Sequence, residues 1–244
     1  MPPDPLNSHA MNSEIARFNM IEQQIRPWSV LDPAVLSLLA SVRREDFVPP
    51  HLRAMAFVDT QVPLLVGDAA GASAAHGASA APCMLEPKVE ARLLQALQVQ
   101  RHESVLEIGA GSGFMAALLA HRALVVTTLE CRAALAQMAR HNLARSGIVN
   151  TAVVDVSAAE GARGRADDGP FDVIVLSGSV PDVPRALLEQ LKPGGRLVAV
   201  VGELPIMRAR LYTRAGAAAW SQTDLFDTVA PRLEGFDEPT RFHF

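Results

Sequence analysis

Basic residues and long apolar runs are both scarce in this sequence. Its 244 residues carry 22 Lys and Arg against 26 Asp and Glu, so the chain lacks the basic excess on which binding to nucleic acid phosphates depends. No stretch reaches the roughly 18 uninterrupted apolar residues typical of a membrane-spanning helix. We therefore expect neither nucleic acid nor a membrane as a partner.

Cysteine is also rare, and the sequence shows no export signal. Cys83 and Cys131 are the two cysteines, and they form neither a CxxC pair nor a disulfide framework, which favours free thiols in a reducing compartment. From Met1 to Ala10 the chain carries prolines and polar residues, where a secretion signal needs a basic start and an apolar run. These absences predict a cytoplasmic protein.

The first hundred residues predict a helical extension in front of a larger domain. We expect a disordered leader over residues 1–12 and, within the extension at 13–100, a helix from Ser13 to Ile25 that ends before Pro27. A second helix is capped by Asp32. The buried face of the first helix is predicted from a stripe of apolar residues: Ile15, Phe18, Ile21 and Ile25.

Residues 67–82 consist almost entirely of Gly, Ala and Ser, which are too small to anchor a core and predict a mobile loop. A helix begins after it at Pro87.

Beyond residue 101 short apolar runs alternate with helical segments, as in βαβ units with a parallel sheet. Residues 207–214 instead alternate apolar with mostly basic side chains, which predicts an antiparallel edge strand. We therefore expect one α/β domain over 101–244. The parallel strands are expected at Val105 to Ile108, Leu124 to Leu129, Thr151 to Asp155, Asp172 to Leu176 and Arg196 to Val201.

A run of three alternate glycines follows the first of these strands. Gly109, Gly111 and Gly113 each lack a Cβ where the chain must turn tightly and approach a ligand. The alternative is a plain glycine-rich turn. The spacing GxGxG differs from the GxGxxG of dinucleotide-binding proteins, whose helix N-terminus faces an anionic pyrophosphate.

Two carboxylates flank this turn. Glu107 lies two residues before the first glycine, where it suits a cationic ligand better than a pyrophosphate. S-adenosylmethionine carries both an ammonium and a sulfonium. Glu130 ends the second strand, where it could accept hydrogen bonds from both ribose hydroxyls or cap the helix that follows at Cys131. The pattern predicts S-adenosylmethionine as the cofactor.

Five segments of the chain carry a family resemblance: Met20 to Ile25, Arg44 to Pro49, Val105 to Gly113, Phe171 to Val175 and Leu187 to Leu197. Together they resemble the protein-L-isoaspartate O-methyltransferase family. The resemblance implies the Rossmann-like class I S-adenosylmethionine-dependent methyltransferase fold, an α/β fold with a seven-stranded, mostly parallel sheet and an antiparallel strand near the C-terminus. It also implies methyl esterification of altered aspartyl carboxylates in peptides or proteins, without a metal.

The resemblance implies further ligand positions. Glu160 and Gly161 match an acid-glycine pair that the family places against adenine, and Ser177 matches a position that borders the methyl-transfer site. The cofactor-binding set is then Glu107, Gly109, Ala110, Gly111, Ser112, Gly113, Glu130, Glu160, Gly161 and Ser177.

One departure from the family concerns the acceptor side. Where the family has Thr-Ile-Ser-Gln-Pro, with a serine associated with catalysis, this chain has Cys83-Met-Leu-Glu-Pro87, so Leu85 replaces that serine. Leucine neither donates nor accepts a hydrogen bond. No catalytic residue is assigned, and neither His76 nor Lys88 receives that role. Two alternatives stay open: a methyltransferase that acts on a different acceptor, and a cofactor-binding homologue without catalysis. The sequence predicts no oligomeric state.

Overall fold

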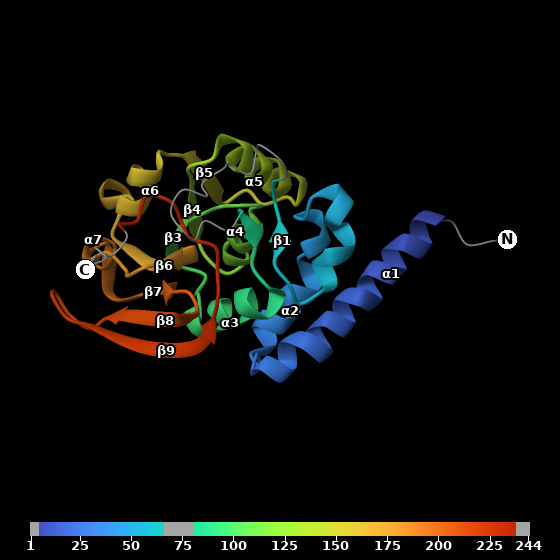
Figure 1. The fold of residues 1–244 in the computed structure, drawn as a ribbon, viewed down its shortest axis with the longest axis horizontal. Helices are drawn as coiled ribbons and strands as arrows, with labels where there is room; N and C mark the ends of the chain where they lie inside the picture. The colour runs from blue at the N-terminus through green and yellow to red at the C-terminus, as the bar shows by residue number, and fades with distance from the viewer. Residues whose placement is uncertain (1–4, 66–80, 238–244) are drawn as a thin grey trace, which may run out of the picture.

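A computed structural model describes residues 5–65 and 81–237 of the chain, with side chains from residue 12 onward. Its centre is a seven-stranded sheet with the order β5-β4-β3-β6-β7-β8-β9 (Figure 1). Every neighbouring pair from β5 to β7 is parallel, while β8 is antiparallel to both of its neighbours. The predicted mostly parallel sheet with a reversed strand is confirmed. Its strands are β3 (Ser104–Ile108), β4 (Val125–Glu130), β5 (Thr151–Asp155), β6 (Phe171–Val180), β7 (Leu191–Glu203), β8 (Ile206–Arg214) and β9 (Trp220–Thr228).

The expected edge position of β8 is wrong, because β9 pairs with its outer side. No strand was predicted over residues 220–228. Most side chains of β9 are polar and exposed, and a strand with little buried surface gives a weak alternation of apolar and polar residues.

Successive residues of the central strands point to opposite faces of the sheet and into two separate cores. Val105 and Val173 belong to the core shared with α3 (Pro87–Leu97), α4 (Phe114–Ala120) and α5 (Ala133–Arg145). Their chain neighbours Leu106 and Ile174 belong to the core on the other face. That face is covered by the short helices α6 (Ala158–Arg163) and α7 (Arg185–Glu189). A sheet covered by helices on both faces buries its strands completely, which explains their nearly continuous apolar sequences.

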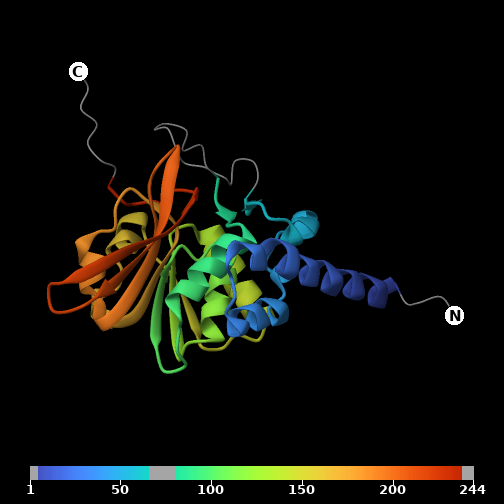
Figure 2. The same cartoon turned by 90° about the horizontal axis from the view of Figure 1, so that it is seen from below.

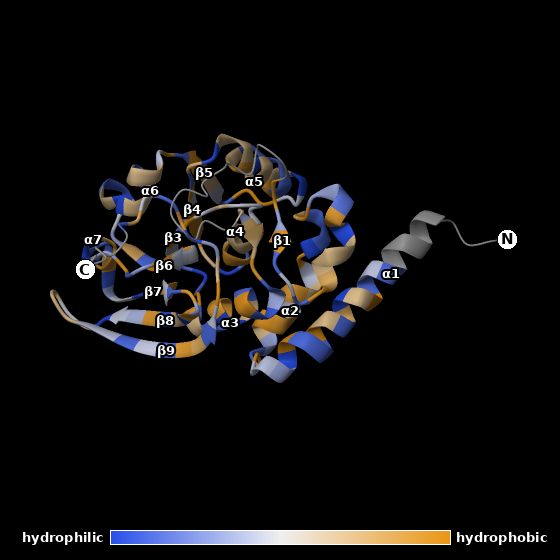
Figure 3. Cartoon of the chain, viewed as in Figure 1, coloured by the Kyte–Doolittle hydropathy of each residue, from blue (hydrophilic) through white to orange (hydrophobic). Residues whose placement is uncertain are grey.

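The N-terminal helix differs from the prediction at its start and in its burial. It begins at Pro5, where a missing backbone N–H costs nothing, so residues 5–12 are helical and residues 1–4 lie outside the described residues. Ile21 and Ile25 are buried as expected, but 54% of Ile15 and 63% of Phe18 is exposed. This part of the helix projects from the body (Figure 2) and carries hydrophilic and hydrophobic residues together (Figure 3).

The rest of the extension packs against the face of the sheet that is covered by α3, α4 and α5. Asp32 caps α2 (Pro33–Ser41) by accepting a hydrogen bond from Ala34 N at 2.8 Å, as predicted. The extension also contains a π-helical turn and three 3-10 segments: Ile21–Ile25, Arg26–Trp28, Arg44–Asp46 and Pro50–Phe57. Another 3-10 turn, Ala166–Asp168, lies before β6. Two short strands, β1 (Val62–Pro63) and β2 (Cys83–Met84), pair with each other on either side of the loop predicted at 67–82. Residues 66–80 of that loop lie outside the described residues. None of the described helices is both long and apolar enough to cross a membrane.

Candidate active site

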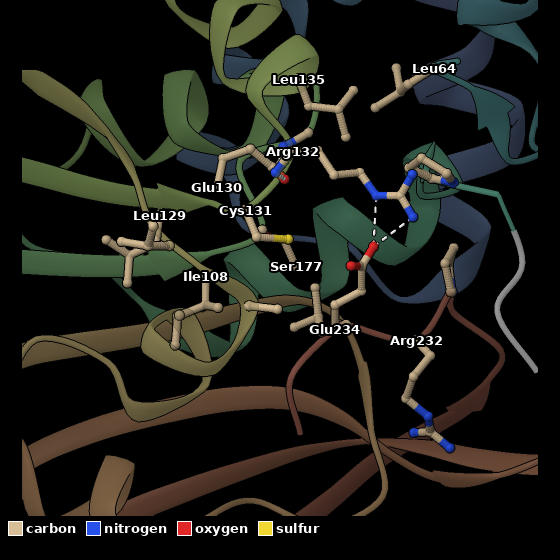
Figure 4. Close-up of a pocket in the computed structure, with 18 of the residues that line it drawn as sticks. Leu64, Ile108, Leu129, Glu130, Cys131, Arg132, Leu135, Ser177, Arg232 and Glu234 are labelled. Atoms are coloured by element: carbon tan, nitrogen blue, oxygen red, sulfur yellow. Dashed lines mark hydrogen bonds and ion pairs between the residues drawn. The ribbon is translucent and has the colours of Figure 1, made fainter. Parts of the chain in front are cut away.

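Two neighbouring clefts open at the carboxyl ends of the parallel strands, the edge where open α/β sheets bind ligands. The larger has an empty volume of about 730 Å³, part of it open to solvent (Figure 4). The smaller has about 370 Å³. Both are lined by the same five residues, so the clefts adjoin one another: Leu64, Cys83, Gly109, Gly111 and Ser177.

The three glycines of the loop between β3 and α4 all have positive φ angles, of 96° at Gly109, 53° at Gly111 and 84° at Gly113. L-residues with a side chain rarely adopt this conformation. Gly109 and Gly111 line both clefts, and Ala110 and Ser112 line the smaller one. Gly113 lines neither. A Cβ there would lie 3.2 Å from Ala139 Cα, so this glycine lets the loop pack against α5.

Glu107 is fully buried at the wall of the smaller cleft. Its Oε1 accepts a hydrogen bond of 2.6 Å from the Ser177 hydroxyl, while its Oε2 has no hydrogen-bond partner among the described residues. Burial raises the pKa of Glu107 to about 7, against the opposing effect of the Ser177 hydrogen bond. A buried acceptor without a partner beside an open cleft fits a ligand that brings a cation or a donor.

Glu130 connects β4 to the glycine loop and to the next helix. Its Oε2 accepts a hydrogen bond from Gly111 N at 2.9 Å, and its Oε1 accepts one from Arg132 N at 3.0 Å. Arg132 is the N-cap residue of α5, so Glu130 supports the start of that helix. The residue also lines the larger cleft. The two interpretations that the sequence allowed are therefore compatible in this geometry.

The structure does not bring the Glu160 side chain to the cleft. Glu160 is exposed, and its Oε2 accepts hydrogen bonds from Ser157 N at 2.8 Å and from Ser157 Oγ at 2.7 Å. Ser157 and Glu160 form a capping box at the start of α6, and these local hydrogen bonds turn the carboxylate away. The cleft wall after β5 is instead made by Val156, Ala158 and Gly161.

Ser177 lies inside β6, directly after Leu176, the last residue of that strand to pair with β3. The β6–β7 ladder shifts register between Val175 and Ser179. Such irregularities re-aim side chains at the edges of sheets. Ser177 therefore reaches both clefts and Glu107.

Leu85 lies in the wall of the smaller cleft and is buried. Its carbonyl oxygen accepts a hydrogen bond of 2.6 Å from Arg44 Nη2. Lys88 points elsewhere, since its Nζ pairs with Asp59 at 2.6 Å and lies 4.0 Å from the ring centroid of Trp28. His76 lies outside the described residues.

The two thiols beside the clefts are held in their protonated form. Burial, and then the charge of Glu86, raises the pKa of Cys83 to about 12. Burial, and then the charge of Glu130, raises the pKa of Cys131 to about 11. Because the thiolate is the nucleophilic form, neither cysteine serves as a nucleophile at neutral pH. No group of His, Cys, Asp and Glu side chains suited to a metal ion occurs within the described part of the chain.

Sequence reasoning missed one wall of the larger cleft. Four consecutive residues near the C-terminus line it: Pro231, Arg232, Leu233 and Glu234. Glu234 pairs with Arg132 across the cleft (Figure 4), with Arg132 Nε donating to Glu234 Oε1 at 2.7 Å. These residues lie in a short segment without apolar periodicity, so the sequence pattern did not single them out.

Comparison with known proteins agrees with this geometry. The family model for protein-L-isoaspartate(D-aspartate) O-methyltransferase (PCMT) matches residues 16–229. The chain belongs to this family. A protein-L-isoaspartate O-methyltransferase of Koribacter versatilis is 36% identical over 211 residues, covering 86% of this chain and 87% of the relative. One from Rhodopseudomonas palustris is 38% identical over 224 residues, covering 90% of this chain and 95% of the relative.

A solved structure shares the fold. It comes from Plasmodium falciparum, is assigned as a protein-L-isoaspartate O-methyltransferase and holds S-adenosyl-L-homocysteine. It aligns with a TM-score of 0.70 at 18% identity, covering 91% of this chain and 98% of that one. The PCMT fold predicted from sequence is therefore confirmed. The family match ends at residue 229, just before the wall formed by residues 231–234.

Proposed function

We propose that this PCMT family member transfers the methyl group of S-adenosylmethionine to the carboxylate of isoaspartyl residues in damaged peptides and proteins. One observation carries the proposal. Glu107, with an unpartnered buried oxygen, lines the smaller cleft just before the glycine loop, and Gly109 and Gly111 of that loop also line the adjoining larger cleft together with Glu130. Family membership gives the acceptor class.

The described residues fit S-adenosylmethionine. Gly109 and Gly111 bring bare backbone to both clefts in conformations with positive φ, and the space that a Cβ on Gly109 would fill is taken by Leu233. Glu107 is the counter-charge for a ligand cation, and Glu130 is an acceptor for ribose hydroxyls. The proposed cofactor-binding set also includes four residues that line the clefts: Ala110, Ser112, Gly161 and Ser177. Gly113 supports the site by packing against α5, and the Glu160 side chain lies outside both clefts.

The cofactor supplies an activated methyl group on a sulfonium. The acceptor needs no general base, because a carboxylate with a reference pKa of about 4 is already ionised at neutral pH. What the chain must do is align the acceptor and exclude water. Alignment of this kind contributes on the order of 7 kcal/mol to lowering a barrier. Leu64, Met84 and Leu85 give the smaller cleft apolar walls for that purpose.

A different acceptor is the second candidate, and Leu85 is the observation that favours it. Among the described residues that line the smaller cleft, only Ser112 and Ser177 carry hydroxyls. An isoaspartyl carboxylate therefore depends for orientation on backbone donors, or on the Ser177 hydroxyl once its one proton is no longer donated to Glu107, since a buried carboxylate without donors costs free energy. Protein repair in the cytoplasm stays a prediction. The free Cys83 and Cys131 are consistent with a reducing compartment.

The test uses purified protein, S-adenosylmethionine with a labelled methyl group, and two peptides that differ only in an isoaspartyl or a normal aspartyl linkage. We expect base-labile methyl ester on the isoaspartyl peptide alone. Label on neither peptide, together with label on other components of a cell extract, would support the different acceptor. Cofactor binding without label on any acceptor would identify a homologue without catalysis.

A further inference from the structure

The segment after β9 crosses the carboxyl edge of the sheet as a strap, defined as residues 230–236 (Figure 1). It is anchored first on β6. Ser179 N donates to Pro231 O at 2.7 Å, Leu233 N donates to Ser179 O at 2.9 Å, and the Ser179 hydroxyl donates to Ala230 O at 2.8 Å. Arg232 Nη2 adds a hydrogen bond of 3.0 Å to Gly202 O at the end of β7. The strap therefore continues the sheet's own hydrogen bonding.

Successive residues of the strap then meet the neighbouring strands in their order within the sheet. Leu233 lies over the loop after β3, where a Cβ on Gly109 would be 2.8 Å from Leu233 Cδ2. Glu234 pairs with Arg132, just after β4. Gly235, with a φ of 85°, lies so close to the Ala158 carbonyl at the start of α6 that a Cβ would collide with it.

Residues 231–233 run parallel to β6, with Arg232 opposite Ser179, so the strap crosses towards β4 and β5 only beyond Leu233. The strap is held at its far end by Phe236, which is buried in the core beneath α6 and α7. It therefore runs along the whole mouth of the larger cleft, from the Ser177 side to the wall at Gly161.

We propose that the strap retains the cofactor, with Leu233 and the Glu234–Arg132 ion pair acting as cofactor-retaining residues. Leu233 packs against the glycine loop and so holds the strap in place. The ion pair closes the cleft between the ends of β4 and β5. A bound nucleoside leaves only when this pair opens. The inference rests on the cofactor site of the proposed function but not on the identity of the acceptor.

The Arg132–Glu234 ion pair is partly exposed to solvent, as a contact that opens and closes must be. The Arg132 and Glu234 side chains are 21% and 42% exposed, and their closest N···O separation is 2.5 Å. Partly exposed ion pairs are worth up to about 1 kcal/mol and are weakened by salt. Retention by the pair should therefore be moderate in size and dependent on ionic strength, while retention by Leu233 should not depend on salt.

The experiment measures dissociation of tritiated S-adenosylmethionine from the full chain, chased with excess unlabelled cofactor and without acceptor. Glu234→Gln should speed dissociation about fivefold at low salt, because that factor corresponds to roughly 1 kcal/mol. Both Glu234→Gln and the double variant Arg132→Gln/Glu234→Gln should lose the salt dependence of dissociation, because both lack the ion pair. Leu233→Ala should speed dissociation at every salt concentration. Glu189→Gln removes an exposed ion pair with Arg185 on α7 and is the matched control.

The melting temperature of the cofactor-free variants separates retention from folding. If Leu233→Ala does not fold, the dissociation rate of the cofactor from Glu234→Gln and the salt dependence of that rate test the role of the strap. If both variants release the cofactor at the wild-type rate, the role of the strap is overturned while the cofactor site itself still stands. If the wild-type protein binds no labelled cofactor, the cofactor site and the strap inference fail together.

Discussion

Arg44 and Glu90 form a buried ion pair that joins the 3-10 turn Arg44–Asp46 to the first turn of α3. The Arg44 guanidinium also donates to the Leu85 carbonyl and lies 5.0 Å from the ring centroid of Phe114, the first residue of α4. One side chain thereby contacts the acceptor-side segment and the helix that follows the glycine loop. The two halves of the site are fixed to each other through this cation.

Loss of the Glu90 charge is expected to destabilise the fold. Glu90→Gln leaves the buried guanidinium without its counter-charge, and breaking a buried ion pair from one side costs about 3–5 kcal/mol. Urea denaturation of the cofactor-free protein measures this loss. Glu22→Gln breaks the exposed pair with Arg26 and should cost less than about 0.5 kcal/mol. Equal costs for the two variants would contradict the importance of the buried pair.

Cofactor affinity should rise with pH through the titration of Glu107. Burial raises its pKa to about 7, so the cofactor-free protein holds a proton that a bound cation must displace. Affinity for S-adenosylmethionine is therefore expected to increase from about pH 5.5 to 7.5, by up to tenfold per unit below the pKa. Calorimetric titrations across this range measure the effect.

Glu107→Gln should bind the cofactor more weakly and lose this pH dependence. Glu160→Gln is the control, since the exposed cap should leave the profile unchanged. The same pKa shift has a consequence for stability. The folded protein keeps a proton that the unfolded chain releases above the ordinary glutamate pKa of 4.5, so the contribution of Glu107 to stability falls as pH rises from about 4.5 to 7. An unchanged pH profile in Glu107→Gln would remove this residue from the cofactor site.

The central strands and the glycine loop could be predicted because their signals are local. Val105 to Ile108 is a buried strand, and its mostly apolar run predicts it. In Thr151 to Asp155 the residues Ala152 and Asp155 are exposed and the other three are half-buried, yet its short apolar run still predicts the strand. The geometry of the glycine loop follows from the conformations that only glycine adopts readily. A feature that depends on contacts between distant segments leaves a weaker trace in the sequence. The strap is an example, since Leu233 meets Gly109 across about half of the chain.

Two differences between expectation and structure show how local and tertiary effects compete. Ile15 and Phe18 fit the apolar stripe of a helix, but periodicity does not reveal whether a partner surface extends far enough to cover them. Glu160 matched a ligand position, yet Ser157, three residues earlier, offers a capping box at little entropic cost. Both outcomes depend on what surrounds the residue rather than on its type.

Two glycines with positive φ should separate backbone strain from contact with neighbours. Gly113 has a φ of 84° and no room for a Cβ, while Gly147, at 71°, has no atom within 4 Å of that position. Gly147→Ala should therefore cost only the strain of the left-handed conformation, about 1 kcal/mol. Gly113→Ala should cost more, by about 1–3 kcal/mol, and weaken cofactor binding because the loop moves. Thermal denaturation and cofactor titration check both, and similar losses in the two variants would refute the packing role of Gly113.

Ser177 links the cofactor side of the site to the acceptor side, so its removal should produce two separable effects. Ser177→Ala deletes the hydrogen bond to Glu107, which lowers the pKa of that carboxyl; the pH at which cofactor affinity rises should therefore move upward. If the hydroxyl turns from Glu107 to the acceptor carboxylate once the cofactor is bound, in place of the serine absent at Leu85, kcat/KM for an isoaspartyl peptide should fall about tenfold at a pH where cofactor is saturating, the size expected for one lost hydrogen bond. Ser41→Ala on α2 is the comparison, because its hydroxyl donates to Leu38 O and Ser41 lines neither cleft. A shift in the pH profile without a change in kcat/KM would confine Ser177 to the cofactor and leave acceptor orientation to the backbone.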